Sequence, residues 1–173
     1  IVAGATMNYV LALLIFGLIA LNFGFAKPVV SEVALNSPAQ KADLRVGDRL
    51  LKVDNSTINT TSDLKLGVIL AKGDAITLEI ERNGEKIIKE IVPTIDKTGN
   101  LVIGITHEFV KNPTIGESIV QGFKDTITMV SQTFKSLKMM FTGEANFKTD
   151  VGGPITIVKM SSQAAKAGIW TLM

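Results

Sequence analysis

The first 26 residues of the chain carry no charged side chain, and the run ends at Lys27. Within it, the 19 residues from Met7 to Phe25 include only two strongly polar side chains, Asn8 and Asn22. As a helix at about 1.5 Å per residue, this stretch would be roughly 29 Å long, close to the ~30 Å hydrocarbon core of a bilayer. A buried helix of a soluble protein normally shows a polar face, and none is visible here. The run therefore predicts a transmembrane helix over residues 1–26.

A secretory signal peptide fits this run poorly, because no basic segment precedes the apolar residues. The chain begins at Ile1 rather than at Met, which leads us to expect a piece of a longer protein. Only one flank of the apolar helix is visible, so the distribution of charge at its ends does not give its orientation.

Composition narrows the functional classes. The net charge is only +2, and acidic and basic residues are mixed along the chain. This is not the charge pattern of a nucleic-acid-binding protein. The chain has no cysteine, which excludes disulfides, zinc ribbons and thiol chemistry. A length of 173 residues leaves room for one span, one compact domain and some further helix.

Residues 27–106 have the pattern of a compact β-rich module. Ser37 is a suitable N-cap and Pro38 a suitable first residue for a short helix. Asn83-Gly84 predicts a hairpin between two alternating strands. The other expected elements are strands over Val29–Leu35, Arg49–Asp54 and Leu101–Thr106, and a helix that is capped at Thr61 or Ser62 and closes at Gly73.

The stretch VSEVALNSPAQKADLRVGDRLLKVDNSTI resembles a PDZ domain, whose S-P-A-x-x-A-x-L-x-x-G-D-x-[IL]-x-x-V pattern it follows. The family's usual Gly is replaced by Asp43. The strand order resembles the circularly permuted bacterial form, in which the peptide-edge strand comes last, so the expected module is a small β-barrel or sandwich with two helices. The matching positions are Ser37, Pro38, Ala39, Ala42, Leu44, Gly47, Asp48, Leu50 and Val53.

Such a module binds by adding an extended peptide to an exposed strand edge beside a helix. The expected edge is Leu101–Thr106, the expected wall is the helix from about Ser62 to Ala71, and the backbone N–H groups of the Gly99-Asn100 loop are candidates to hold a terminal carboxylate. Gly47 and Asp48 are expected to form a turn rather than to bind. The alternative for Ile103, Ile105, Leu64 and Val68 is that these four residues are simply core. The candidate peptide-binding residues are Gly99, Asn100, Leu101, Ile103, Ile105, Leu64 and Val68.

After a linker over 107–113, residues 114–142 predict an amphipathic helix. Thr114 and Glu117 have the spacing of a capping box. Three placements remain open for its apolar face: a membrane surface, a partner helix or ordinary core. The membrane implied by the first helix favours the membrane surface. The apolar stripe is Val120, Phe123, Ile127, Val130, Phe134, Leu137 and Phe141, opposite Gln121, Lys124, Ser131, Lys135 and Lys138.

Residues 143–173 contain a Gly-Pro segment that leads toward a further membrane helix. Ala3, Gly4 and Asn8 match an A-G-P-x-x-N element, with Ala5 in place of its Pro. Gly153, Pro154 and Ile155 match a G-P-[IV] element. With the module between them, these flanks resemble the site-2 protease family of intramembrane zinc metalloproteases, in its bacterial regulated-intramembrane-proteolysis branch.

The resemblance implies hydrolysis of peptide bonds in the membrane by a zinc-bound water. That site needs H-E-x-x-H, with the Glu as general base, and an Asp from a later L-D-G segment. Neither motif is present, and the only histidine, His107, stands in H-E-F-V-K. We therefore expect His107-Glu108 to be a surface turn, assign no catalytic or metal-binding residue, and expect zinc only in the full-length enzyme. This chain alone should be inactive.

Two functions follow from these expectations. The first is a central fragment of an intramembrane metalloprotease that cleaves membrane proteins, with the PDZ domain as a substrate filter or peptide-binding module. The second is a membrane-anchored PDZ adaptor without catalysis, in a secretion or protease-docking system. The expected partners are membrane lipid and a transmembrane protein or peptide substrate. The expected location is the plasma membrane, with several spans in the full protein and the PDZ domain outside the cytoplasm.

Overall fold

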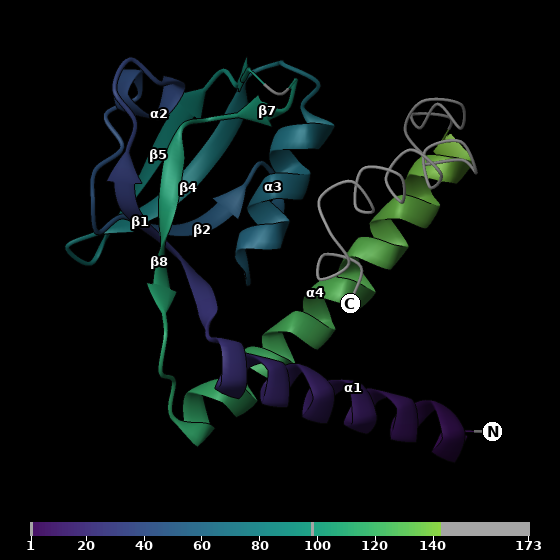
Figure 1. Ribbon diagram of the computed structural model, residues 1–173. Helices are drawn as coiled ribbons and strands as arrows, with labels where there is room; N and C mark the ends of the chain where they lie inside the picture. Colours follow the sequence, from purple (N-terminus) through teal and green to yellow (C-terminus); the bar gives the residue numbers. More distant parts are fainter. Residues whose placement is uncertain (1, 98, 143–173) are drawn as a thin grey trace. The chain divides into compact units, whose positions relative to one another are not determined.

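The computed structural model describes residues 2–97 and 99–142 of the chain. The chain divides into two compact units, one from Ile1 to Val130 and one from Ser131 to Met173. The β-module and the candidate site described below belong to the first unit, whereas the long helix Ile115–Thr142 begins in the first unit and ends in the second (Figure 1). The Gly-Pro segment with Gly153 and Pro154 lies outside the described residues.

The predicted N-terminal helix is present as α1 (Val2–Phe23). Its stretch Thr6–Phe23 is long and apolar enough to cross a membrane, and no other helix among the described residues passes that test. Gly4 and Asn8 of the predicted family motif both lie in α1, and a Cβ built at Gly4 would meet no atom within 4 Å. Most large apolar side chains of α1 are exposed, Leu14 and Leu18 among them.

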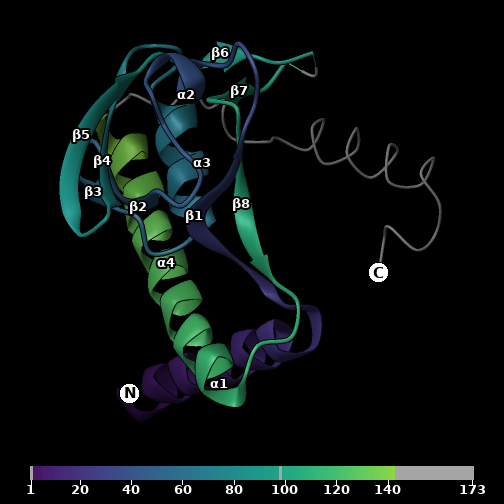
Figure 2. The same ribbon diagram turned by 90° about the vertical axis from the view of Figure 1, so that its left-hand side faces the viewer.

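A β-module follows α1 and extends from Phe25 to Val110. Its six-stranded sheet has the order β5-β4-β2-β1-β8, with β3 paired to β2, and all the pairs are antiparallel. A second, two-stranded sheet of β6 and β7 lies close to the short helix α2 (Figure 2). The strands are β1 (Phe25–Val33), β2 (Arg49–Val53), β3 (Ser56–Thr57), β4 (Ile76–Arg82), β5 (Glu85–Ile91), β6 (Thr94–Ile95), β7 (Leu101–Val102) and β8 (Ile105–Val110).

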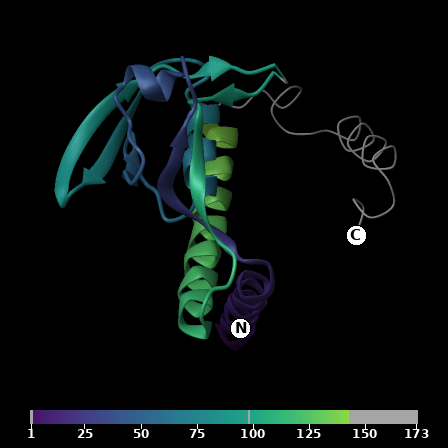
Figure 3. The ribbon, with the colours of Figure 1, turned by 60° about the vertical axis from the view of Figure 1, so that its left-hand side comes forward.

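Several local predictions are confirmed. The Ser37 side chain accepts a hydrogen bond from the Gln40 backbone N–H at 3.2 Å and caps α2 (Pro38–Lys41). Asn83 and Gly84 both have positive φ, as a tight hairpin turn between β4 and β5 requires, and Figure 3 shows this hairpin projecting as a curved ribbon. The helix α3 (Thr61–Leu70) is also present, but its N-cap is Thr60, so the predicted cap at Thr61 or Ser62 is wrong by at least one residue.

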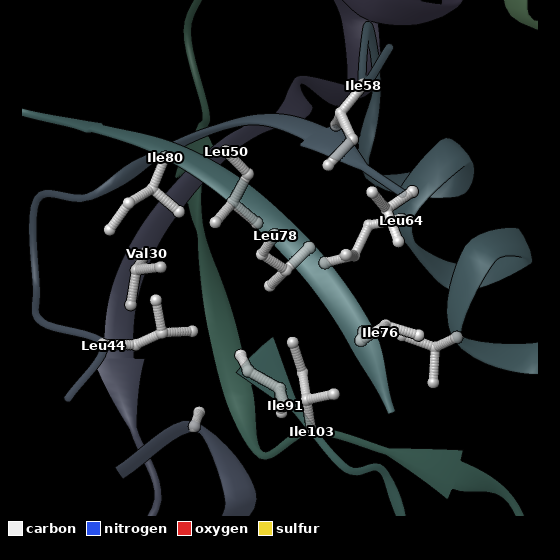
Figure 4. Packing of buried hydrophobic residues seen from close by; sticks show 13 residues of the cluster. Val30, Leu44, Leu50, Ile58, Leu64, Ile76, Leu78, Ile80, Ile91 and Ile103 are labelled. Carbon is white, nitrogen blue, oxygen red and sulfur yellow. The ribbon is translucent and has the colours of Figure 1, made fainter. Parts of the chain in front are cut away.

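The hydrophobic core fills the space between the sheet, α2 and α3. Leu50, Ile76, Leu78 and Ile80 are each at most 1% exposed, and Figure 4 shows them spread along β4 and its neighbour within one apolar cluster. α3 lies close against β2, because a Cβ built at Gly67 would stand 2.6 Å from a methyl carbon of Val53. Burial of this apolar surface is the main term that stabilises the module.

Gly47 and Asp48 form a turn, as predicted, and Asp48 has a second role. Gly47 has a φ of +92°, and its N–H donates to the Val30 carbonyl at 2.8 Å. The Asp48 carboxylate is 1% exposed, and it accepts hydrogen bonds from the Arg45 backbone N–H and from Arg82 Nε and Nη2 at 2.7–2.8 Å. The turn is therefore attached to β4 through a buried ion pair.

The last predicted strand is divided, and the predicted turn at His107-Glu108 is wrong. Gly104 has a φ of +82°, which separates β7 from β8, and a Cβ there would stand 2.3 Å from Ser37 Cβ. β8 continues to Val110 in register with β1, whose Val30 pairs with His107. Pairing with a strand some 75 residues earlier in the chain keeps this segment extended. The predicted module end at residue 106 and the start of the 107–113 linker therefore fall inside β8.

The predicted amphipathic helix is α4 (Ile115–Thr142), and the Thr114–Glu117 capping box is present. In the part of α4 that belongs to the first unit, the polar face is the covered one. Ser118, Gln121 and Thr128 are buried, whereas the predicted apolar residues Val120, Phe123 and Ile127 are exposed. The alternative that these three apolar side chains pack in the core is therefore wrong.

Small residues bring α4 against α1. A Cβ built at Gly122 would lie 2.7 Å from the Leu13 carbonyl oxygen and 2.8 Å from the Gly17 nitrogen. Since real Cβ atoms do not approach so closely, glycine at position 122 is a condition of this crossing.

Candidate functional site

A groove of about 590 Å³ lies between α3 and the segment that connects β7 to β8. One wall is made by four residues of α3: Leu64, Lys65, Val68 and Ile69. The other wall is made by Leu101 to Ile105 and by His107, and Asp96 and Asn100 also line the groove. Figure 1 shows α3 beside β7, next to the sheet edge that β8 forms.

β8 gives this groove an open strand edge. It lies at the end of the sheet order and pairs only with β1 among the described strands. An edge strand presents unpaired N–H and C=O groups to any further strand. Because successive side chains alternate between the two faces of a strand, Ile105 and His107 point to the same face, and both line the groove. The site can therefore receive an extended segment along β8 and side chains between β8 and α3.

His107 is the polar residue of β8 in this groove. Its ring is half-buried, and Nδ1 is enclosed without a hydrogen-bond partner among the described residues. Burial lowers the pKa of the imidazole, and the positive charge of Lys65 lowers it further. The ring is therefore neutral near pH 7, and the two basic side chains of the groove lie close enough to influence each other.

The backbone N–H groups that were predicted to hold a ligand carboxylate already donate hydrogen bonds within the Asp96–Asn100 loop. The Gly99 N–H donates to the Asp96 carbonyl at 3.1 Å, and the Asn100 N–H donates to the Asp96 carboxylate at 2.9 Å. A ligand carboxylate would have to displace these bonds. At the other end of β7, the carbonyls of Ile103 and Gly104 accept hydrogen bonds from Ala39 and Ala34, so this turn is held firmly against α2 and β1.

The structure brings six of the seven predicted binding residues to one groove. Gly99 does not line it. Leu64, Val68 and Ile103 are each at most 4% exposed and belong to the core cluster, so they shape the groove floor as much as they fill the core. The six residues are Asn100, Leu101, Ile103, Ile105, Leu64 and Val68. Sequence analysis missed Lys65, Ile69, Asp96 and His107 as lining residues. The alternation Ile103-Ile105-His107 already placed His107 on the same face if the strand continued.

The groove wall is also connected to α4. The Asp63 carboxylate at the start of α3 is 3% exposed, and it accepts hydrogen bonds from the N–H groups of Asn59 and Thr60. It accepts a third from Thr128 Oγ1 of α4 at 3.0 Å. Leu64 and Lys65 of the groove follow Asp63 directly. A single buried carboxylate thus caps α3 and attaches it to α4.

The described residues do not fit a catalytic zinc site. In residues 2–97 and 99–142, no group of three or more His, Cys, Asp or Glu side chains could hold a metal ion. His107 belongs to the groove, where its neighbour is the cationic Lys65. No catalytic step is therefore derived from the side chains that the structure describes.

The chain thus combines an exposed apolar helix, a β-module with an open groove and a second long helix. The chain belongs to peptidase family M50, the site-2 protease family, whose model matches residues 1–173. A Clostridium perfringens protein named "putative zinc metalloprotease" is 50% identical over 171 residues, which cover 99% of this chain and 51% of that protein. The zinc metalloprotease RasP of Geobacillus kaustophilus is 27% identical over 178 residues, which cover 100% of this chain and 42% of that protein.

The chain thus spans about half the length of these relatives. Among solved structures, it is similar to the PDZ domain of an SdrC-like protein of Listeria monocytogenes, with 24% identity and a TM-score of 0.42. That similarity covers 48% of this chain and 88% of the Listeria chain.

Proposed function

We propose that this chain is the central part of a zinc-dependent intramembrane peptidase that performs regulated proteolysis of membrane proteins. In this proposal α1 crosses the plasma membrane, and the β-module is a circularly permuted PDZ domain on the extracytoplasmic side. Zinc and its ligands are supplied by the longer protein, and this chain binds none. The substrate is a transmembrane protein or a peptide derived from one.

The observation that carries the proposal is the open edge of β8 beside a groove walled by α3. Addition of an extended segment to such an edge supplies main-chain hydrogen bonds, and the groove adds side-chain selection. Membership of family M50 supports the peptidase activity of the whole protein. The exposed apolar residues of α1 support the membrane location. The groove then acts as a substrate filter ahead of the catalytic centre.

The experiment uses the full-length gene product, purified in detergent and mixed with a model single-span substrate. Zinc content is measured by mass spectrometry and cleavage by gel. Ile69→Glu places a charge in the groove at a side chain that is 59% exposed, so the fold should survive. Leu70→Glu, on the adjacent residue that does not line the groove, is the matched control. We expect bound zinc, cleavage by the full protein, and reduced cleavage by Ile69→Glu only.

Three other results would separate the alternatives. A full-length protein without zinc and without cleavage would contradict the peptidase and favour the membrane-anchored PDZ adaptor. Cleavage that is unchanged by Ile69→Glu would leave the peptidase standing but would exclude peptide capture in the groove. Cleavage by this chain alone would contradict the assignment of the zinc ligands to the rest of the protein.

A further inference from the structure

The groove has an uneven distribution of polar groups along its length. Lys65 and His107 line it from α3 and from β8, whereas Asp96 and Asn100 line it from the loop that precedes β7. The space between is lined by aliphatic side chains such as Val68 and Ile105. A ligand side chain that carries a negative charge is therefore favoured beside Lys65 and His107 and disfavoured beside Asp96.

The protonation state of His107 determines which hydrogen bonds its ring can form with a ligand in the groove. A proton on the enclosed Nδ1 would bury an N–H donor without an acceptor, which is costly. The neutral ring therefore carries its proton on Nε2, the nitrogen that is not in the enclosed position. Because the ring lines the groove, Nε2–H is the donor that a ligand can reach. Lys65 adds an exposed ammonium group on the facing helix. The Nε2–H of His107 and the ammonium of Lys65 can both donate hydrogen bonds to a ligand, and neither of these two groups can accept one.

We propose that Lys65 and His107 form a specificity subsite that selects an acidic side chain in the bound segment. Ile105 and His107 are two residues apart on one face of β8, about 6.7 Å along the strand. An extended ligand has the same period, so its acidic residue lies two positions from the apolar residue that packs beside Ile105. This inference rests on the proposed function, because it assumes that a segment lies along β8.

The test compares peptides that differ in one residue. Fluorescein-labelled hexapeptides that end in Glu-Ala-Val, Gln-Ala-Val or Ala-Glu-Val are titrated into the full chain in detergent, and affinity is measured by fluorescence polarisation. We expect the Glu-Ala-Val peptide to bind about 5–10-fold more tightly than the Gln-Ala-Val peptide, as a charge-assisted hydrogen bond at a partly exposed site allows. The Ala-Glu-Val peptide should gain nothing, because its Glu points to the other face.

Variants assign the selectivity to the two residues. Lys65→Gln and His107→Phe should each reduce the ratio between the Glu-Ala-Val and Gln-Ala-Val affinities toward one. Lys41→Gln, at an exposed lysine of α2 outside the groove, should leave that ratio unchanged. Ile69→Glu should weaken all three peptides, and the two that carry Glu most, because its carboxylate lies one helical turn from Lys65.

The single histidine of the chain allows a spectroscopic check. In a ¹⁵N–¹H correlation spectrum of the imidazole, we expect the Nε2–H tautomer at pH 7 and a shift when the Glu-Ala-Val peptide is added. Equal affinities for Glu-Ala-Val and Gln-Ala-Val, with binding still lost in Ile69→Glu, would overturn the subsite and leave peptide capture intact. Absence of any binding that depends on Ile69 would overturn both the subsite and the capture role.

Discussion

Asp48 illustrates how one side chain stabilises a turn and a sheet together. Its carboxylate is buried beside the Gly47 turn and forms a two-point contact with Arg82 of β4. Burial alone would raise the pKa of this carboxyl. The hydrogen bonds from Arg82 and from the Arg45 N–H lower it by more, so its pKa lies below the usual value. Asp43 adds a further carboxylate to Arg82, at 3.4 Å.

Asp48→Asn should destabilise the chain by about 3 kcal/mol near pH 7, because it removes the buried carboxylate that Arg82 contacts at 2.7–2.8 Å and leaves only the exposed Asp43 at 3.4 Å as its charged partner. A lowered folded-state pKa stabilises the fold above the unfolded value of about 3.9, and this contribution is lost as the pH falls through the folded value. The difference between wild type and variant should therefore shrink in acid.

The measurement is urea unfolding in detergent, followed by circular dichroism at several pH values. Glu81→Gln is the control, because the Arg49–Glu81 pair at 3.7 Å is exposed and should contribute less than about 1 kcal/mol. An effect of Asp48→Asn that is small at pH 7, or that grows in acid, would contradict this account of the turn.

The structural role of a residue could be predicted from the sequence where that role depends on local backbone conformation. Asp43 occupies the position where the PDZ pattern has glycine, and its φ of +56° shows why glycine is usual there, since Asp tolerates this conformation better than most residues. The partner of Asp48 could not be predicted, because Arg82 is 34 residues away and only the folded sheet brings the two together.

At the scale of elements, α3 and α4 meet at the Asp63 carboxylate, whose charge also acts on a second carboxylate, Asp125 of α4. The Asp125 carboxylate is half-buried and accepts a hydrogen bond from the Gln121 side-chain amide at 2.9 Å. Burial raises the pKa of Asp125, and the negative charge of Asp63 raises it further. The Gln121 bond and Lys124 oppose this rise. Ionisation of Asp125 therefore lowers the stability of the folded state.

Asp125→Asn should therefore stabilise the chain near pH 7, by less than about 1 kcal/mol since the carboxyl is only half-buried. An Asp whose folded pKa is raised destabilises the fold as the pH rises above the unfolded value of about 3.9. Below that value both variants are neutral at this position and should be equally stable. Thermal unfolding at pH 3.5 and pH 7 checks the sign, and a loss of stability at pH 7 would contradict it.

The contact between α3 and α4 can be trapped covalently, because the chain has no cysteine of its own. Thr60 Oγ1 and Thr128 Oγ1 are 3.5 Å apart, so cysteines at these two positions should form a disulfide under mild oxidation. The product is detected by gel mobility after proteolysis, with and without reductant. The pair Thr60→Cys with Met129→Cys should not cross-link, since Met129 is 58% exposed on the other face of α4. Equal cross-linking of both pairs would argue against a fixed contact.

Elements were predicted correctly where their ends carry local signals, as at Ser37, Asn83-Gly84 and Thr114. The division of the last strand at Gly104 was missed, because a single glycine does not reveal whether the chain continues or turns. Periodicity in α4 identified which residues share a face. It could not show which face is covered, since this depends on Gly17 of α1 and Thr60 of the β-module.

At the scale of the whole molecule, two apolar surfaces lack cover within the described residues. One is α1, with exposed side chains along its length. The other is the face of α4 with Ile119, Val120, Phe123 and Ile127. Contiguous apolar surface of this extent is unusual for a soluble protein and marks contact with a membrane or a partner. The two helices touch at Gly17 and Gly122, so the same lipid phase could cover both.

If lipid covers this face of α4, Phe123 should meet acyl chains. Phe123→Trp, in a Trp170→Phe background that removes the only native tryptophan, is reconstituted into vesicles with brominated lipids. We expect strong quenching of its fluorescence, because bromine quenches indole only at close range. Ile88→Trp on β5 is the control, since Ile88 is 71% exposed on the β-module and should stay in water. Equal and weak quenching at both positions would mean that the apolar face of α4 does not contact lipid and that a protein partner covers it instead.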